Sequence, residues 1–390
     1  MDKLLVVSRK FPPSIGGSQL VMRNLFTFFS PEEYMVCHDD ERINVNQGNE
    51  FTYHELRIDF PHFIRKILGS LLIPLYIFLI PIIVYKLLRL HKKEKIGKCL
   101  INYPDPFFSV AGYIFSRVAN IEYFLYFHDL FSEAQKKYTR VVQKLLAEVF
   151  ERQMIRKTQN FMVISEGLRD FYEEKYNIRP TVLPHSIDLS ILNQNPLVEK
   201  KMHSLPKITR IVYSGGVYDD QYDAILAFVK AIKNSDLNIK FVISSKSPRK
   251  YFEKIGIADE NTEVVFFEND EDVFRLQKQA DILYLPLAFE SPAPLEVKMA
   301  IPTKIFEYIA SMRPILVHCP ADSFLSEFCR KNKIGYVFNT KEEKDILLCI
   351  EKLTNRDEYH IDYRHRVNFL KKYDRKKIYR KFRKIIGFHC

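Results

Sequence analysis

Lys304 and Glu307 carry opposite charges and stand three residues apart in the sequence. Apolar residues around them recur at spacings of three and four, which predicts a short helix over Thr303–Ser311 that starts at Pro302-Thr303. A helix N-terminus with a hydroxyl and a lysine can hold an anion. A carboxylate one turn further along can accept hydrogen bonds from sugar hydroxyls. These residues suit a nucleotide diphosphate with its ribose, although an ordinary amphipathic helix with a solvated lysine and glutamate explains them equally well.

Two apolar runs flank this helix. Asp281–Pro286 has the compact pattern of a buried strand ended by a proline, and Ile315–Val317 is the next such run. The helix therefore follows the carboxyl end of a strand, which is where ligands bind in open α/β sheets.

Two further groups of candidate residues follow strands in the first half of the chain. Gly16 and Gly17 lie in a loop after Lys3–Ser8, where glycines let the backbone approach a ligand, or simply make a tight turn. His128 ends the apolar run Glu122–His128. A histidine at the end of a sheet strand can bond a phosphate or a sugar hydroxyl, or be satisfied by the backbone.

Strand and helix patterns alternate along the whole chain, which predicts an α/β protein with two doubly wound parallel sheets. The strands predicted for the first half are Lys3–Ser8, Tyr34–His38, Phe51–Leu56, Lys98–Asn102, Glu122–His128, Asn160–Ile164 and Thr181–Leu183. Those of the second half are Ile208–Tyr213, Lys240–Ser244, Glu263–Phe267, Asp281–Leu285, Ile315–Val317 and Gly335–Phe338. The polar, irregular stretch Leu189–Lys207 between the halves is the best candidate for a domain boundary.

The sequence P-T-K-I-F-E-Y-I-A-S-M-R-P-I-L, residues 302–316, resembles the donor-sugar motif of the retaining glycosyltransferases of family 4. These have the GT-B fold, in which two Rossmann-like domains face a central cleft. The resemblance implies that Glu307 contacts the nucleotide ribose and that Thr303 and Lys304 lie by the diphosphate. It also places Gly16 and Gly17 in the loop that faces the reaction centre on the acceptor side, and His128 against the reacting sugar.

Two features depart from the family's pattern. Many members have a second glutamate eight residues before the position of Glu307, where this chain has Met299. Gly215 matches the family's glycine after the first strand of the second domain, but the arginine and lysine that clamp the diphosphate are missing, and Asp219 and Asp220 would repel it. The residues that we consider as replacement cations are Lys246, Arg249, Lys298 and Lys304.

Composition narrows the classes of partner. The 390 residues carry 59 Lys and Arg against 48 Asp and Glu, a net charge of +11, which favours phosphate-bearing partners. No nucleic-acid-binding module is recognisable, so nucleotide substrates and anionic lipids remain. The 6 cysteines are scattered without metal-ligand or disulfide spacing. We therefore expect no metal and no cofactor beyond the nucleotide-sugar substrate. We also expect no signal peptide, because Leu4–Val7 is only a strand core.

The segment 63–95 is unusual because its nineteen residues Ile67–Tyr85 carry no charge and basic residues flank them. That length is close to a bilayer span. A spanning helix would put residues 1–62 and 97–390 on opposite sides of the membrane and cut the first sheet, so we reject it. A wholly buried helix remains open. We favour a monotopic segment that dips into one leaflet with its basic flanks on anionic headgroups.

The resulting division of the chain is an acceptor domain over residues 1–190, which includes segment 63–95, and a nucleotide-sugar domain over residues 207–355. Residues 356–390 form a basic C-terminal helix, since Arg364–Lys384 holds eleven Lys or Arg among interspersed apolar residues. This helix is either solvated or lies beside a membrane.

The function implied by the resemblance is the retaining transfer of a sugar from a UDP- or GDP-sugar to a lipid-linked or growing glycan. We expect the protein to be cytoplasmic and peripheral on the inner face of the cell membrane of a bacterium, in surface polysaccharide biosynthesis. Two alternatives remain open. One is a sugar-nucleotide 2-epimerase of the same architecture, and the other is a non-catalytic GT-B partner subunit docked at the membrane.

Overall fold

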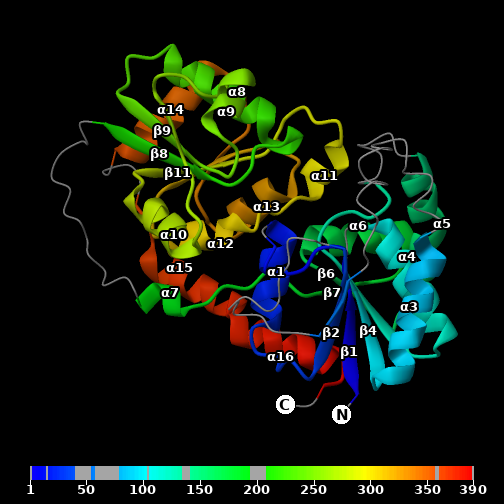
Figure 1. Ribbon diagram of the computed structural model, residues 1–390. Helices are drawn as coiled ribbons and strands as arrows, with labels where there is room; N and C mark the ends of the chain where they lie inside the picture. Colours follow the sequence, from blue (N-terminus) through cyan, green and yellow to red (C-terminus); the bar gives the residue numbers. More distant parts are fainter. Residues whose placement is uncertain are drawn as a thin grey trace. The chain divides into compact units, whose positions relative to one another are not determined.

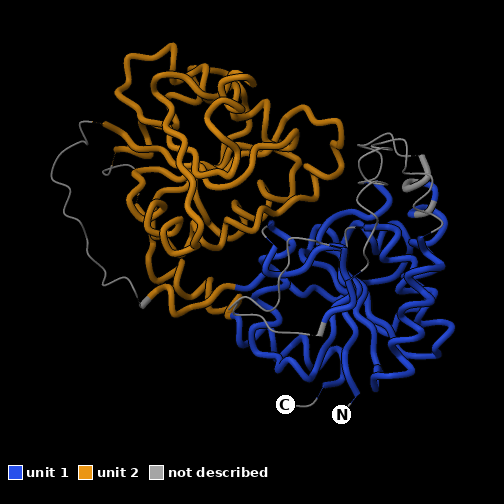
Figure 2. The backbone as a smooth tube through the Cα atoms, in the orientation of Figure 1, with its two compact units in different colours: residues 1–186, 375–390 blue, residues 187–374 orange. Residues whose placement is uncertain are grey.

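The computed structural model describes residues 2–14, 16–39, 54–57, 79–102, 105–133, 141–193, 208–355 and 360–388. The chain divides into two compact units (Figure 2): unit 1 is residues 1–186 with 375–390, and unit 2 is residues 187–374. Each unit has one parallel sheet with helices alternating along the chain (Figure 1). This is the predicted class of two Rossmann-like doubly wound domains.

The sheet of unit 1 has the strand order β3-β2-β1-β4-β5-β6-β7, and every neighbouring pair is parallel. The strands are β1 Lys3–Val7, β2 Tyr34–His38, β3 His54–Arg57, β4 Ile96–Asn102, β5 Glu122–Phe127, β6 Asn160–Val163 and β7 Thr181–Val182. Leu4–Val7 of the central strand is completely buried, as expected for a parallel strand covered on both faces.

The sheet of unit 2 has the order β10-β9-β8-β11-β12-β13 and is also parallel. Its strands are β8 Thr209–Ser214, β9 Ile239–Ser244, β10 Thr262–Val265, β11 Ile282–Pro286, β12 Ile315–His318 and β13 Tyr336–Phe338. The order reverses between β8 and β11, and in unit 1 between β1 and β4. Ligands of such sheets bind beyond the carboxyl ends of the strands at these reversal points.

Helices cover both faces of each sheet. Those of unit 1 are α1 Gly17–Phe26, α3 Leu79–Lys93, α4 Pro106–Val118, α5 Val141–Lys157, α6 Glu166–Tyr176 and α16 Arg375–Ile385. Those of unit 2 are α7 Ser190–Asn193, α8 Asp219–Lys233, α9 Arg249–Lys254, α10 Asp270–Gln279, α11 Pro294–Met299, α12 Lys304–Ala310, α13 Phe324–Lys331, α14 Glu343–Thr354, α15 Tyr363–Leu370 and the 3₁₀ helix η3 Lys371–Tyr373.

The core of unit 2 shows the two-residue period of its strands. Val212 and Leu283 pack in one buried cluster, whose helical side comes from α10, α12, α13 and α15. Their neighbours Tyr213 and Tyr284 belong to a second cluster, whose helical side comes from α8 and α14. Successive side chains of a strand point to opposite faces, so each central strand contributes to both cores.

The C-terminal tail is divided between the two units rather than forming one separate helix over residues 356–390. In unit 2, Phe369 and Tyr373 pack together, and Tyr373 also lies 4.6 Å, centroid to centroid, from Phe306. In unit 1, α16 packs Phe382 5.8 Å from Phe26. The apolar residues interspersed with the basic ones in the tail are therefore core residues of two different units.

The boundary between the halves lies slightly before the predicted polar stretch. The units divide after Ser186, and Ser190–Asn193 form the short helix α7 in unit 2. Residues 194–207 lie outside the described part of the chain.

The unusual segment 63–95 is described only from Leu79 onward, where α3 begins; residues 63–78 lie outside the described part. The buried face of α3, which includes Ile83 and Leu87, packs against α4, where His91 lies 6.1 Å from Phe115. No helix within the described residues is both long enough and apolar enough to cross a membrane.

We predict that Phe382→Leu lowers the free energy of unfolding of unit 1 by about 1–2 kcal/mol, because it removes part of a fully buried ring and leaves a cavity. Equilibrium unfolding in urea measures the change. The control is Lys384→Ala on the exposed face of the same helix, which should change stability by less than about 0.5 kcal/mol. Equal midpoints for the two variants would contradict the packing of α16 on unit 1.

Candidate functional site

The candidate site of unit 2 begins where β8 ends, at Gly215. Its φ of 129° lies in the range that favours glycine, and a Cβ placed there would come 2.8 Å from Nζ of Lys304. The Nζ atom lies 4.0 Å from the centroid of the Tyr213 ring. Glycine at this position therefore lets the lysine of α12 reach across the end of the strand, at the point where the strand order reverses.

The charge of a neighbouring carboxylate offsets only part of the desolvation of the Lys304 ammonium group. Burial lowers its pKa to about 7, even though the neighbouring carboxylate of Glu307 acts in the opposite direction. A lysine with this pKa can gain or lose its proton near neutral pH. An anion bound beside it would restore the charged form, so the site has the electrostatics of an anion receptor.

Glu307 is held by a side chain from a third element. Gln277, at the end of α10, is fully buried and donates from Nε2 to Oε2 of Glu307 at 3.2 Å and to Oγ of Ser214 at 3.0 Å. The hydroxyl of Tyr308 accepts from the backbone N–H of Ser214 at 3.0 Å. The end of β8, α10 and α12 are thus fastened together around the carboxylate.

Thr303 immediately precedes α12 and makes no capping hydrogen bond with its side chain. The helix has only 7 residues, Lys304–Ala310, slightly fewer than predicted. So short a helix has a small dipole, and the ammonium group of Lys304 therefore contributes more of the positive charge here than the helix terminus does.

The acidic residues that follow the strand end serve the architecture of unit 2. Oδ1 of Asp220 accepts a hydrogen bond from the Ser291 hydroxyl at 3.1 Å. The carboxylate of Asp223 accepts from the backbone N–H groups of Phe289 and Glu290 at 2.9 to 3.2 Å. Asp220 and Asp223 therefore hold the loop after β11, and the repulsion of a diphosphate by Asp219 and Asp220 stays a prediction.

The other cations considered as replacements for the clamp differ in their surroundings. Arg249 is engaged by Glu253 and by the backbone carbonyls of Asp259 and Thr262. Lys298 lies 3.4 Å from Asp322. Lys246 is exposed in the loop after β9. Among these cations, the structure brings Lys304 together with Gly215 and Glu307.

The candidate site of unit 1 lies at the carboxyl end of β5. Nδ1 of His128 is 2.5 Å from Oγ of Ser18, in the first turn of α1. The helix begins at Gly17 with Gly16 as its N-cap, so Gly16 and Gly17 lie immediately beside this contact. Ser18 is the second residue of the helix, and its hydroxyl bonds His128 rather than capping the helix.

His128 is a neutral imidazole that uses only one of its two ring nitrogens, Nδ1, for a hydrogen bond within the described residues. Burial and the neighbouring His185 lower its pKa to about 3. Its Nε2 atom is buried and has no hydrogen-bond partner in the described part of the chain. A buried polar atom of this kind is costly unless water or another group satisfies it, and the contact of His128 with a sugar stays a prediction.

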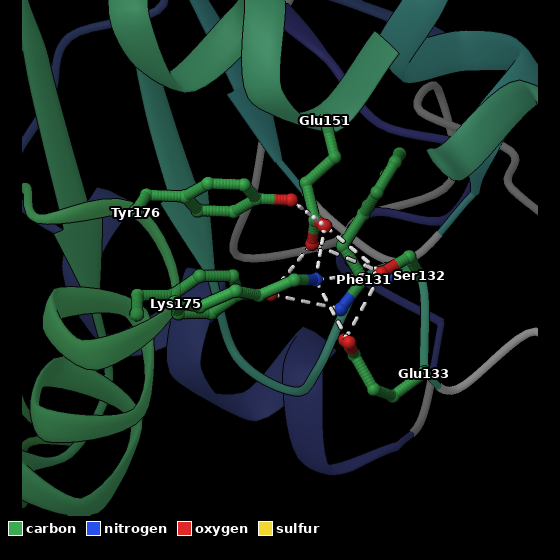
Figure 3. A network of polar contacts seen from close by, with 7 residues as sticks. Phe131, Ser132, Glu133, Glu151, Lys175 and Tyr176 are labelled. Carbon is green, nitrogen blue, oxygen red and sulfur yellow. Dashed lines mark hydrogen bonds and ion pairs between the residues drawn. The ribbon is translucent and has the colours of Figure 1, made fainter. Parts of the chain in front are cut away.

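A buried ionic network fixes the loop that follows His128 (Figure 3). The completely buried carboxylate of Glu151 accepts hydrogen bonds from Lys175 and Tyr176, each at 2.6 Å, and from Ser132 at 2.9 Å. Burial opposes the charge of Lys175, but Glu151 and Glu133 more than offset it and raise the pKa of the lysine. The network joins α5, α6 and the loop after β5, and thereby positions the end of that strand.

The sequence pattern did not indicate three residues that contact the candidate site residues: Ser18, Tyr213 and Gln277. Each contacts a residue of another element, so only the tertiary structure reveals it.

We predict that Gln277→Leu weakens donor binding about tenfold, by about 1.4 kcal/mol, because Glu307 loses the donor that orients it. Folding stability should also fall, by about 1–3 kcal/mol, because Ser214 and Glu307 lose a buried donor that joins three elements. Calorimetry and thermal unfolding on the same sample test both statements, and unchanged donor affinity would contradict the role of Gln277.

The architecture is that of the GT-B glycosyltransferases, with two Rossmann-like domains. Residues 208–356 match the family model described as Glycosyl transferases group 1. HepE of Anabaena, solved with UDP and glucose, is similar with a TM-score of 0.69 and 11% identity over 99% of this chain and 100% of that one. Sucrose-phosphate synthase of Thermosynechococcus elongatus has a TM-score of 0.66 and 11% identity over 99% and 98% of the two chains.

A third similar structure is the UDP-forming α,α-trehalose-phosphate synthase of Burkholderia vietnamiensis, with a TM-score of 0.64 and 10% identity over 99% of this chain and 100% of that one. At such identities a structural likeness shows the fold alone. No curated protein matches the sequence. The family model and the fold together support a GT-B glycosyltransferase, and membership of family 4 stays a prediction.

Proposed function

We propose that the protein is a retaining glycosyltransferase that binds a nucleotide-diphosphate sugar on unit 2. The observation that carries the proposal is the arrangement of Lys304 at the end of β8, with Gly215 making room for it and Glu307 held beside it by Gln277. The lysine suits a diphosphate and the carboxylate suits the two hydroxyls of a ribose. Structures of HepE hold UDP or UDP-glucose, which supports UDP as the nucleotide.

Catalysis in this proposal is electrostatic. As the bond between the sugar and the diphosphate breaks, negative charge develops on the leaving phosphate, and the ammonium group of Lys304 stabilises it. The acceptor oxygen forms the new glycosidic bond as the bond to the diphosphate breaks, and the proton of the acceptor hydroxyl passes to the departing phosphate oxygen. His128 of unit 1, a neutral imidazole, contacts a hydroxyl of the reacting sugar through Nε2, and Gly16 and Gly17 line the acceptor side. No metal ion or cofactor takes part, so a chelator should leave transfer unchanged.

The proposed acceptor is a lipid-linked or growing glycan at the cytoplasmic membrane face, in surface polysaccharide biosynthesis of a bacterium. The net charge of +11 and the uncharged stretch Ile67–Tyr85 with its basic flanks support a peripheral position on an anionic membrane.

A panel of UDP- and GDP-sugars tests the donor site, by calorimetry on the full chain in detergent. We expect one nucleotide series to bind. Absence of binding by every donor would contradict the proposal and favour the non-catalytic partner subunit. NMR of the transferred sugar then distinguishes a retained from an inverted anomeric configuration. Incubation without acceptor separates the transferase from a 2-epimerase, which would convert a UDP-sugar alone.

A further inference from the structure

One face of α3 is exposed and changes character along the helix. Ile82 and Tyr85 are 48% and 60% exposed, and Arg89 and Lys92 follow on the surface. Spacings of three, four and three residues place these four side chains on the same side of the helix, opposite the face buried on α4. The guanidinium carbon of Arg89 lies 5.8 Å from the centre of the Tyr85 ring. The exposed face is therefore apolar in its first half and cationic in its second.

Helix α5 repeats this arrangement. Leu145 and Val149 are 60% and 50% exposed, and Arg152 and Arg156 follow on the surface at spacings of three and four residues. The opposite side carries the buried residues Met154 and Ile155. Two helices that are not neighbours in the sequence thus present the same order of apolar and cationic residues.

The two helices belong to one layer of unit 1 (Figure 1). Helix α4 contacts both, for example where Tyr113 lies 6.2 Å from Phe150 of α5. Helices that connect parallel strands run antiparallel to those strands, so their N-terminal ends lie at the carboxyl edge of the sheet. The apolar halves of α3 and α5 therefore lie toward the edge where β5 ends at His128. The cationic halves lie about seven residues, or about 10 Å, further along each helix at 1.5 Å per residue.

We name these residues the α3/α5 surface: Ile82, Tyr85, Leu145 and Val149 with Arg89, Lys92, Arg152 and Arg156. We propose that the α3/α5 surface docks edge-on against an anionic lipid bilayer. The apolar residues would reach the hydrocarbon boundary, and the cations would lie on headgroup phosphates. One consequence rests on the proposed function. The edge of the unit 1 sheet that carries His128 would face the membrane, which is the source of a lipid-linked acceptor.

The charges favour a bilayer over other occupants. Neither α3 nor α4 contains Asp or Glu, and α5 contains the exposed Glu148 and the buried Glu151. A second copy of the chain could cover the apolar residues, but the same surface on that copy carries the same cations and so offers them no acidic partners. A soluble polyanion would bind the cations and leave the apolar band in water. A bilayer accommodates both bands, because its apolar interior is bounded by phosphates.

The basic helix α16 is a second surface of unit 1 that could bind anionic lipid. Its exposed residues include Lys376, Lys377, Arg380, Lys381 and Lys384. Its apolar residues, such as Ile378 and Phe382, are buried in unit 1, so α16 offers charge but no side chains that could enter a leaflet. This excludes the insertion of an amphipathic tail helix and makes α16 the matched comparison for the test.

The experiment is co-sedimentation of the full-length protein with phosphatidylcholine vesicles, with and without phosphatidylglycerol and in the absence of donor. We expect binding to anionic vesicles to fall at least tenfold in Ile82→Ser/Leu145→Ser and in Arg89→Glu/Arg152→Glu. The control Phe266→Ser/Leu348→Ser removes unit 2 residues that are 52% and 47% exposed and should bind like the wild type. Donor calorimetry on each variant shows that unit 2 is intact, so failure of docking and failure of the proposed function are distinguishable.

Three results would overturn the proposal. The first is wild-type protein that binds neither type of vesicle, or binds both equally. The second is unchanged binding by both α3/α5 variants, or a loss caused instead by Lys377→Glu/Lys381→Glu on α16. The third is a wild-type dimer in light scattering that Ile82→Ser/Leu145→Ser dissociates, without vesicle binding, which would assign the surface to a second copy.

Discussion

Glu307→Gln should raise the dissociation constant of the donor about 100-fold, the largest loss of affinity that we expect from a single change. In the proposed function this carboxylate accepts charge-assisted hydrogen bonds from two ribose hydroxyls, each worth about 1.5–3 kcal/mol. The substitution keeps the size of the side chain and its contact with Gln277 but removes the charge, for a total loss of about 3 kcal/mol. Calorimetry with the preferred nucleotide sugar measures the loss.

The matched control for this prediction is Glu327→Gln, the same change at an exposed position of α13 in unit 2. It should leave donor affinity unchanged. Thermal unfolding of both variants shows whether unit 2 is still folded. A donor affinity within about threefold of the wild type in Glu307→Gln would mean that the ribose binds elsewhere, and the assignment of this site would fail.

The fold could be predicted from the sequence because its signals are local. Strand β2, Tyr34–His38, has the predicted bounds, and the other strands lie within a few residues of their predictions where the structure describes them. Apolar runs of this length with turn residues between them are typical of buried parallel strands. The division of the tail was not predictable in the same way. The apolar residues of α16 show that the helix is covered, but the surface that covers it comes from α1 and the residues just after it, more than three hundred residues earlier.

The candidate sites show the same contrast. Lys304 and Glu307 are detectable because they stand three positions apart on one helix. Gln277 lies thirty residues before Glu307, and only the packing of α10 beside β8 brings the two together. Asp223 carries no local sign that its carboxylate accepts from backbone N–H groups of the loop after β11. Side chains that act across elements depend on the tertiary structure, and residue type at one position does not specify them.

Lys304→Met should lower kcat/KM about 10³-fold, because it removes a cation from the developing charge of the leaving phosphate. A distinctive signature of the lysine is pH dependence. In the free protein its pKa is lowered to about 7, and a bound diphosphate favours the ammonium form and raises the pKa again. Below pH 7 the lysine is charged with or without donor, so affinity is constant. Above pH 7 the free protein must take up a proton on binding, and donor affinity falls by up to about tenfold per pH unit.

Lys304→Arg is the control that isolates this effect. A guanidinium group stays charged across the whole range, so the fall in affinity above pH 7 should disappear even if the absolute affinity changes. Calorimetry from about pH 6 to pH 9, in two buffers with different ionisation enthalpies, gives both the affinity and the number of protons taken up. A pH-independent wild type, or a slope that persists in Lys304→Arg, would show that another group binds the diphosphate. The lysine would then belong to the scaffold of unit 2, packed on Tyr213, and a different cation would have to be sought.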